Sequence, residues 1–294
     1  MCWNSVSKAS VNNGNWPAPM RIDAHHHFWQ YDPVRHDWIS EEMQAIRRNF
    51  LPADLKPLLD KAQIDGTVYV QVDQTEAETN WMLEHADQHD FIQGVVGWVD
   101  LQSRDVEDRL AYFSQFPKLK GFRHIVQGES DKRFLLRPAF MKGIGFLSKF
   151  QFTYDILVYP EHLPVVKDFV KKFPDQLFVL DHLAKPFIRK GELQPWQNDI
   201  KALAAFDNVC CKVSGMVTEA DWKLWKPGDL APYLQTVLDC FGPGRLLYGS
   251  DWPVCLVAAS YEKQLRVVDD FISGFSIHER EAIMGHNAMR FYHL

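Results

Sequence analysis

The stretch MRIDAHHHFW, at Met20–Trp29, decides the fold. It opens with a short β-rich run that ends in three consecutive histidines, and similar runs recur along the chain. In order, the runs are Met20–His25, Gly66–Asp73, Phe91–Val99, Leu119–Val126, Thr153–Tyr159, Leu177–His182, Asn208–Ser214 and Arg245–Ser250. They do not alternate strictly between polar and apolar residues, which is typical of strands buried on both faces of a parallel sheet.

Amphipathic segments separate these runs. They are Ala53–Ile64, Trp81–Gln88, Val106–Phe116, Pro138–Lys149, Pro164–Phe173, Pro195–Ala205 and Leu230–Phe241. Regular alternation of strand and helix predicts a parallel α/β sheet, and eight such units close most naturally into a (β/α)₈ TIM barrel. A doubly wound open sheet is the alternative, and it is disfavoured because no GxGxxG or P-loop follows any of the runs.

The length and composition fit a single domain. The chain has 294 residues, of which 46% are hydrophobic and 24% charged, and barrels of this class reach about 250 residues or more as one domain. We therefore expect one barrel domain at residues 20–294, preceded by a flexible, polar tail at residues 1–19 that does not resemble a signal peptide. The longest irregular insertion, Phe28–Leu51, is rich in aromatic residues and is expected to form a lid or a pocket wall.

Charge and hydropathy argue against several functional classes. The net charge is −6 and no basic run is present, so no nucleic-acid partner is expected. No apolar stretch approaches the ~20 residues that a membrane helix needs. The five cysteines form no CxxC pair, and the adjacent Cys210 and Cys211 are expected to be reduced core thiols. We expect a cytoplasmic protein, and the sequence allows a homo-oligomer.

Ionisable residues gather where the runs end. The residues concerned are Asp23, His25–His27, Arg123, His124, Asp155, Asp181, His182, Lys212, Ser214, Ser250 and Asp251. Barrel enzymes place their catalytic groups at the carboxyl ends of the strands, and burying polar groups is costly unless they are paired or bind something. We therefore expect these side chains to meet at one rim of the barrel.

The first of these ends predicts a metal site. Residues i and i+2 of a strand point the same way, so His25 and His27 can hold one cation together, whereas His26 points into the opposite layer. His182 would add a third nitrogen, and the carboxylate of Asp251 could bind a cation and accept a proton from water. The structural alternatives are a His182 that is hydrogen-bonded to its neighbouring aspartate and an Asp251 that caps a helix.

Arg123 and Lys185 are candidate clamps for an oxyanion or a carboxylate, because the guanidinium forms a planar fork. Neighbours on a strand face opposite ways, so we expect Arg123 in the pocket, while His124 either reaches substrate or packs in the outer layer. Lys185 is alternatively a solvated loop lysine. Three tryptophans could line the wall of a substrate pocket or simply pack in the core, namely Trp29, Trp98 and Trp252.

Taken together, these motifs resemble the amidohydrolase superfamily, and more narrowly its sugar-lactonase branch of L-fuconolactonase- and L-rhamnonolactonase-like hydrolases. The resemblance extends over nearly the whole chain from about Met20 onward. The matching pieces are RIDAHHHFW at Arg21–Trp29, GVVGWVDL at Gly94–Leu101, KGFRHIVQ at Lys120–Gln127, YDILVYPEHL at Tyr154–Leu163, LDHLAKP at Leu180–Pro186, YGSDWPV at Tyr248–Val254 and NAMRFY at Asn287–Tyr292.

The resemblance implies one divalent metal, expected to be zinc, with His25, His27, His182 and Asp251 as its ligands. Binuclear members of the superfamily have a modified lysine on strand four and histidines on strands five and six. This sequence instead has arginine and histidine on strand four, and strand five carries Asp155 and no histidine. At most one metal is therefore expected, and its requirement is open because some relatives in this branch are understood to hydrolyse lactones without one.

The activity that the resemblance implies is hydrolysis of a small-molecule sugar lactone, such as L-fucono- or L-rhamnono-lactone. Asp251 would act as general base on water, and the metal or Arg123 would stabilise the oxyanion. His182 or His124 would protonate the leaving oxygen. The alternatives are a metal-dependent decarboxylase of an aromatic carboxylic acid and a non-catalytic barrel that binds a partner. The DHLAKP and GWVDL motifs favour the lactonase, and the retained ligand set favours an enzyme.

Overall fold

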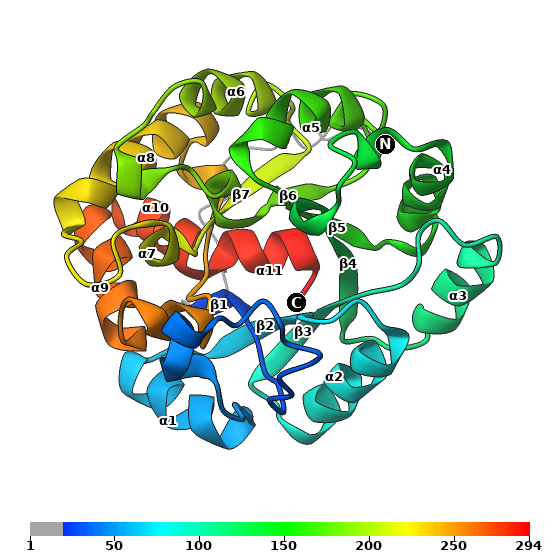
Figure 1. Cartoon of the computed structure of the whole chain (residues 1–294), viewed down its shortest axis with the longest axis horizontal. Helices are drawn as coiled ribbons and strands as arrows, with labels where there is room; N and C mark the ends of the chain where they lie inside the picture. The colour runs from blue at the N-terminus through cyan, green and yellow to red at the C-terminus, as the bar shows by residue number, and fades with distance from the viewer. Residues whose placement is uncertain (1–19) are drawn as a thin grey trace.

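The computed structural model describes residues 20–294, so the predicted tail at residues 1–19, which contains Cys2, lies outside the described residues. Eight parallel strands follow one another around a ring in chain order, with helices on the outside (Figure 1). This is the (β/α)₈ barrel predicted from the sequence. The strands are β1 Ile22–His26, β2 Gly66–Val70, β3 Ile92–Gly97, β4 Leu119–Ile125, β5 Thr153–Leu157, β6 Phe178–Leu180, β7 Val209–Val213 and β8 Leu246–Tyr248.

Helices surround the ring and close it at the strand starts. They are α1 Pro52–Ala62, α2 Glu76–Gln88, α3 Val106–Phe113, α4 Pro138–Leu147, α5 Leu163–Val170, α6 Trp196–Leu203, α7 Met216–Glu219, α8 Pro227–Phe241, α9 Tyr261–Phe271, α10 Ile277–Glu281 and α11 Asn287–Tyr292. Hydroxyl caps set three of the starts, because the side chains of Thr75, Ser260 and Ser276 accept the backbone N–H groups of Glu78, Lys263 and Glu279. Among the helices of residues 20–294, none is long and apolar enough to span a bilayer.

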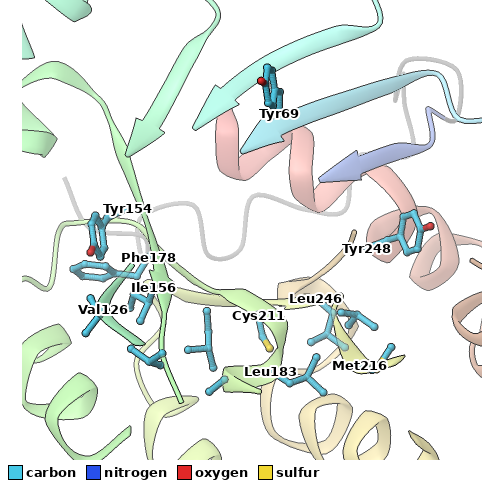
Figure 2. Close-up of a cluster of buried hydrophobic side chains, with 14 of the residues drawn as sticks. Tyr69, Val126, Tyr154, Ile156, Phe178, Leu183, Cys211, Met216, Leu246 and Tyr248 are labelled. Carbon is cyan, nitrogen blue, oxygen red and sulfur yellow. The ribbon is translucent and has the colours of Figure 1, made fainter. Parts of the chain in front are cut away.

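Two apolar cores stabilise the barrel. The outer core lies between the strands and the helices, and Figure 2 shows part of it around Tyr154, Phe178 and Cys211. The inner core fills the ring with small and branched side chains such as Val68 and Leu247, together with Tyr292 of α11. Helix α11 crosses the ring in Figure 1, next to the strand starts, so the barrel interior is packed below the strand ends.

Along strand β1, the side chains at every second position do not all face the same side of the sheet. Ile22 and Ala24 belong to the inner core, but His26 stacks on Tyr69 of the outer core, with 5.5 Å between ring centroids. The β1–β2 register shifts between Asp23 and His26, which accommodates this change in the manner of a β-bulge. As a result His26 faces outward, as predicted, and the histidines on either side of it face the interior.

The ring closes between β1 and β8. The backbone N–H of Asp251 donates to the carbonyl of His25 at 2.8 Å, and the N–H of His27 donates to the carbonyl of Trp252 at 2.7 Å. These bonds join the end of β1 to the segment that follows β8, so they set the spacing between the histidines at the end of β1 and Asp251.

The side chain of Asp23 reinforces this junction. Its carboxylate accepts the backbone N–H of Ser250 at 2.8 Å and the hydroxyl of Tyr261 at 3.0 Å. The carboxyl is fully buried, and this burial raises its pKa to about 6 although both bonds act in the opposite direction. Asp23 therefore ties β1, β8 and α9 together from beneath the site.

The cysteines within residues 20–294 are free thiols. They are Cys210, Cys211, Cys240 and Cys255. Burial raises the pKa of the Cys210 thiol to about 12, so it stays protonated at neutral pH. The prediction of reduced core thiols at Cys210 and Cys211 is confirmed.

We predict that two glycines of α4 respond oppositely to alanine. A Cβ at Gly143 would lie 2.0 Å from the carbonyl oxygen of Leu101, whereas at Gly145 the nearest atom is 3.8 Å away on Phe173. Gly143→Ala should lower the free energy of unfolding by about 1–3 kcal/mol, because backbone must move. Gly145→Ala should be neutral or stabilising by up to about 1 kcal/mol through helix propensity. Urea unfolding followed by circular dichroism measures both, and equal losses would contradict the packing described.

Candidate active site

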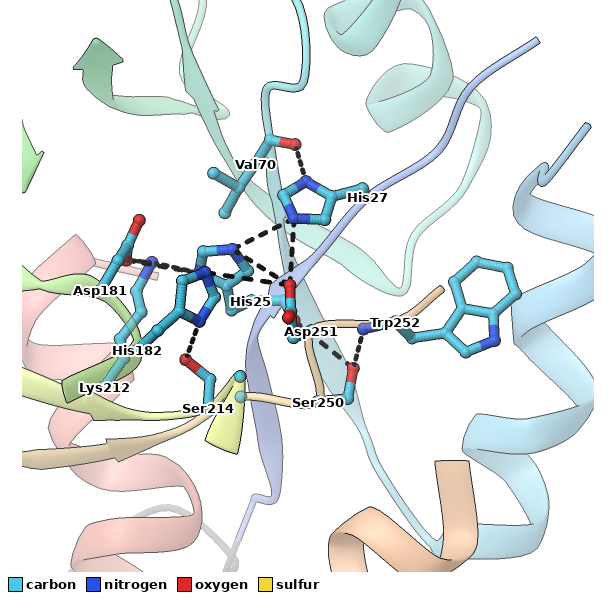
Figure 3. Close-up of polar contacts among 12 residues, drawn as sticks. His25, His27, Val70, Asp181, His182, Lys212, Ser214, Ser250, Asp251 and Trp252 are labelled. Atoms are coloured by element: carbon cyan, nitrogen blue, oxygen red, sulfur yellow. Dashed lines mark hydrogen bonds and ion pairs between the residues drawn. The ribbon is translucent and has the colours of Figure 1, made fainter. Parts of the chain in front are cut away.

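The residues predicted from distant strand ends meet in one place (Figure 3). The Nε2 atoms of His25 and His27 are 3.2 Å apart. Oδ1 of Asp251 lies 3.4 Å from Nε2 of His27 and 3.9 Å from Nε2 of both His25 and His182. All four side chains are buried, with at most 5% of any of them exposed. One carboxylate oxygen therefore faces three imidazole nitrogens that come from β1 and from the end of β6.

The outer nitrogen of each imidazole is held by another part of the barrel. The neighbours of the Nδ1 atoms are the carbonyl of Val70 at 2.8 Å from His27, the hydroxyl of Ser214 at 2.8 Å from His182, and the carboxylate of Asp181 at 3.3 Å from His25. Imidazoles that bind metals usually donate their second N–H to such groups. When Nδ1 carries the proton, each Nε2 presents a lone pair to the shared space.

These donors fit a single divalent cation. Burial lowers the pKa of His25 well below its usual value and that of His182 to about 4, so the rings are neutral, as metal binding requires. The 3.2 Å between the Nε2 atoms of His25 and His27 is close to the ~3.3 Å edge of a tetrahedron whose nitrogens lie ~2.0–2.1 Å from zinc. Two facing lone pairs beside a carboxylate form a set that a cation satisfies.

Asp251 is ionised at neutral pH. Burial alone would raise its pKa, but His182, His27 and Lys185, together with the hydrogen bond from His27, lower the pKa below its usual value. A carboxylate that stays charged next to a cavity can bind a cation or accept a proton from water.

A buried network of charges supports His25 from the side opposite the cavity. Nζ of Lys212 lies 2.5 Å from Asp155, 3.1 Å from Asp181 and 3.1 Å from Nδ1 of His25. Nη1 of Arg123 donates to Asp181 at 3.0 Å. Burial would raise the pKa of Asp181, but Lys212, His25 and Arg123 together hold it well below its usual value. Two cations and two carboxylates therefore balance one another in the barrel interior.

This network also bears on a second cluster of potential ligands. His25, Asp181 and His182 present ligand atoms within 4.8 Å of one another. The carboxylate of Asp181 is already paired with Lys212 and Arg123 at 3.1 and 3.0 Å, so its charge is neutralised by side chains. In the cluster of His25, His27 and Asp251, Nη1 of Arg123 lies 3.4 Å from Nε2 of His25, but Asp251 forms no ion pair with a lysine or arginine of residues 20–294.

The backbone that carries these groups is strained. His182, Leu183, Ala184 and Lys185 have φ angles of 53°, 55°, 59° and 51°, and Asp251 has a φ of 57°. Each residue with a side chain in this left-handed region costs ~1–2 kcal/mol, and such outliers concentrate at functional sites. The strain turns His182 and Lys185 toward the barrel mouth immediately after β6.

Gly215 makes room for His182. Its φ angle is +65°, and a Cβ placed there would lie 2.5 Å from Nδ1 of His182. Only glycine combines this backbone conformation with this close approach. The Ser214–Gly215 turn after β7 therefore both positions the imidazole and supplies its hydrogen-bonding hydroxyl.

A cavity of about 580 Å³ opens above the histidines and Asp251. The insertion at residues 28–51 contributes Arg35, Trp38 and Met43 to its lining, so the predicted pocket wall is confirmed. The predicted residues that line it are His27, Arg123, His182, Lys185 and Asp251.

Four predicted substrate contacts lie elsewhere, namely Trp29, Trp98, Trp252 and His124. Trp29 donates its indole N–H to the carbonyl of Arg48 at 2.9 Å, and the Trp252 ring packs 5.2 Å from that of Phe50. These two indoles stabilise the base of the insertion. The prediction that they line the wall of the substrate pocket is therefore wrong, and both rings pack in the core instead.

The other two of these residues contact each other in the outer layer. The indole N–H of Trp98 donates to Nδ1 of His124 at 3.3 Å. The His124 ring stacks on Phe134 with 4.5 Å between centroids, and its Nε2 lies 2.8 Å from Glu129. Strand alternation sends His124 outward because Arg123 faces the interior.

The cavity lining that sequence reasoning did not single out includes Trp38, Glu219 and Trp222. Trp38 lies in the insertion that was expected to form a wall, and its aromatic content was the available signal. Glu219 ends the short helix α7, and Trp222 follows it. Neither lies in a predicted strand or helix, so periodicity gave no indication of their place.

Fold and site define an α/β-barrel protein with a buried cluster of three histidines and one aspartate at the carboxyl ends of its strands. The chain belongs to the Amidohydrolase family, whose sequence model matches residues 22–294. It is 38% identical to an L-fucono-1,5-lactonase of Burkholderia multivorans over 286 residues, which cover 94% of this chain and 96% of that protein. It is 37% identical to an L-fucono-1,5-lactonase of Burkholderia ambifaria, over 93% of this chain and 96% of that protein.

Structural comparison agrees with these sequence matches. A crystal structure of an amidohydrolase from Burkholderia multivorans with bound zinc superposes with a TM-score of 0.91 and 38% identity. The superposition covers 94% of this chain and 99% of the other.

We predict that Lys212 is essential for stability. Lys212→Met would leave Asp155 and Asp181 buried without their shared cation, so the free energy of unfolding should fall by about 3–5 kcal/mol. Lys149→Met is a matched control, because its partner Glu107 and Lys149 itself are 43% and 61% exposed, and such pairs contribute at most about 1 kcal/mol. Denaturant unfolding compares the two variants. Similar small losses in both would contradict the role of the buried network.

Proposed function

We propose that this chain is an enzyme that opens a sugar lactone, such as L-fucono-1,5-lactone, to its hydroxy acid. The observation that carries the proposal is the Asp251 carboxylate facing three buried imidazoles beside a cavity of about 580 Å³, in a chain 38% identical to an L-fucono-1,5-lactonase. We also propose that His25, His27, His182 and Asp251 hold one divalent ion, zinc. Bound there, the ion would act as a Lewis acid that stabilises charge on the carbonyl oxygen.

Asp251 is the general base of the proposed reaction. Its lowered pKa keeps it ionised, so it can take a proton from the water that attacks the ring carbonyl. As the ring opens, the same carboxyl returns this proton to the departing ring oxygen, which leaves as a hydroxyl. His182 is not the acid in this scheme, because burial lowers its pKa to about 4, and His124 lies outside the cavity.

In the proposed reaction, the guanidinium of Arg123 stabilises the negative charge that develops on the carbonyl oxygen. The guanidinium lines the cavity, lies 3.4 Å from Nε2 of His25 and is held rigidly by Asp181 and by the carbonyl of Gln71. A donor fixed in advance needs no reorganisation when negative charge develops on the substrate.

The charges around the cavity favour a neutral substrate over an aromatic carboxylic acid. The charged lining residues are Arg35, Arg123, Lys185, Asp37, Asp73, Glu219 and Asp251. Arg35 is paired with Asp73 at 2.8 Å, and Arg123 with Asp181 at 3.0 Å. Among residues 20–294, the lining of the cavity has no excess of positive side chains that could bind a substrate carboxylate. A polyhydroxylated lactone therefore suits the cavity better than the aromatic acid that a decarboxylase would bind.

We predict that the wild type acidifies a pH-indicator solution of L-fucono-1,5-lactone and that Asp251→Asn is slower by about 10²–10⁴-fold, because the general base is lost. A chelator should lower the wild-type rate, and added zinc should restore it. The measurement is the initial rate in a screen of aldonolactones with and without chelator, with metal content determined for each sample.

Asp60→Asn, on the exposed face of α1, is the control variant and should match the wild type. Full activity in Asp251→Asn would remove the role assigned to this carboxylate. Release of carbon dioxide from a dihydroxybenzoate without any lactone opening would replace the lactonase by the decarboxylase.

A further inference from the structure

Glu219 is a carboxylate in the cavity that the proposed chemistry does not use. It ends α7 directly after β7, its side chain is 22% exposed, and it lines the same cavity as Asp251. Within residues 20–294 its carboxylate accepts no hydrogen bond, and its one ion-pair contact is Lys185, with 4.0 Å between Oε1 and Nζ. Burial raises the pKa of Glu219, with Lys185 acting in the opposite direction.

Lys185 is the matching cation. The left-handed segment after β6 brings it to the cavity, where 19% of its side chain is exposed and its Nζ lies 5.7 Å from the centre of the Tyr159 ring. A separation of 4.0 Å from Glu219 exceeds the ~3.2 Å limit of a good N–H···O hydrogen bond. Each group therefore keeps hydrogen-bonding capacity that its partner does not use.

Two residues next to the pair, Thr218 and Trp222, have their polar groups bonded within the α7 turn. The Thr218 hydroxyl donates to the carbonyl of Gly215 at 2.6 Å, and the indole N–H of Trp222 donates to the carbonyl of Thr218 at 2.8 Å. These bonds hold the α7 turn, and Lys185 and Glu219 are the charged side chains that face the cavity beside it. Leaving such charged groups partly buried without hydrogen bonds is costly.

We propose that Lys185 and Glu219 form a hydroxyl-binding subsite, an inference that rests on the proposed lactonase function. One ring hydroxyl of the substrate accepts a hydrogen bond from Nζ of Lys185 and donates one to the carboxylate of Glu219. A hydroxyl can do both at once, whereas a substrate carboxylate would be repelled by Glu219 and a substrate ammonium by Lys185. The pair thus selects hydroxylated lactones over plain ones and takes no part in ring opening.

The test compares kcat/KM for L-fucono-1,5-lactone with that for δ-valerolactone, which has no ring hydroxyls. Glu219→Ala and Lys185→Met should each lower the value for the sugar lactone by about 10–100-fold, because a site built to bind a hydroxyl loses its partner. For δ-valerolactone the change should stay within about 3-fold at pH 7, because His182 and His27 also lower the pKa of Asp251 and keep this base ionised when Lys185 is replaced. The double variant should be little worse than either single one, because both groups bind the same hydroxyl.

Glu219→Gln keeps an acceptor oxygen and should retain more sugar-lactone activity than Glu219→Ala. Glu192→Gln, at an exposed position, should leave both substrates unaffected, and circular dichroism checks that every variant is folded. Equal losses on both lactones, or no loss on either, in a wild type that opens the sugar lactone would overturn this subsite alone. A wild type that opens no lactone would overturn the proposed function and the subsite with it.

Discussion

The hydrogen bonds between β1 and β8 are the constraint on which the site depends. They join the carbonyl of His25 to the N–H of Asp251 and the N–H of His27 to the carbonyl of Trp252, at 2.8 and 2.7 Å. Because the barrel closes through these atoms, the same bonds that complete the sheet hold two imidazoles beside a carboxylate. A slip of one residue at this junction would turn the histidines to the outer layer, so barrel closure and formation of the site are one event.

Charge balance in the barrel interior is the second requirement. Lys212 and Arg123 compensate Asp155 and Asp181, and Tyr292 of α11 donates its hydroxyl to Asp155 at 2.8 Å. The helix that closes the strand starts is thereby connected through hydrogen bonds to the support of His25. Removing one partner of a buried ion pair is strongly destabilising. Asp181 is already paired with Lys212 and Arg123, whereas Asp251 has only histidine partners, so Asp251 is the carboxylate beside which a cation would add charge.

Much of this arrangement could be predicted from the sequence, because strand periodicity is local. The eight runs, the shared direction of His25 and His27, and the meeting of His182 with Asp251 all follow from strand ends that share one rim. Helices α7 and α9–α11 were not predicted, although the spacing of Tyr261, Leu265 and Val268 in α9 is typical of an amphipathic helix. The left-handed turn at His182–Lys185 and the outward place of Trp252 depend on tertiary contacts that override local pattern, and the cavity walls come from loops such as the one carrying Trp222.

The central claim is that the imidazoles and Asp251 enclose one ion position. Anomalous scattering from zinc-soaked crystals, recorded on both sides of the zinc absorption edge, tests it most directly. We expect one strong peak within ~2.0–2.2 Å of the Nε2 atoms of His25 and His27 and of an oxygen of Asp251. A peak at Asp181 instead, or none in the cavity while zinc is bound elsewhere on the protein, would contradict the account.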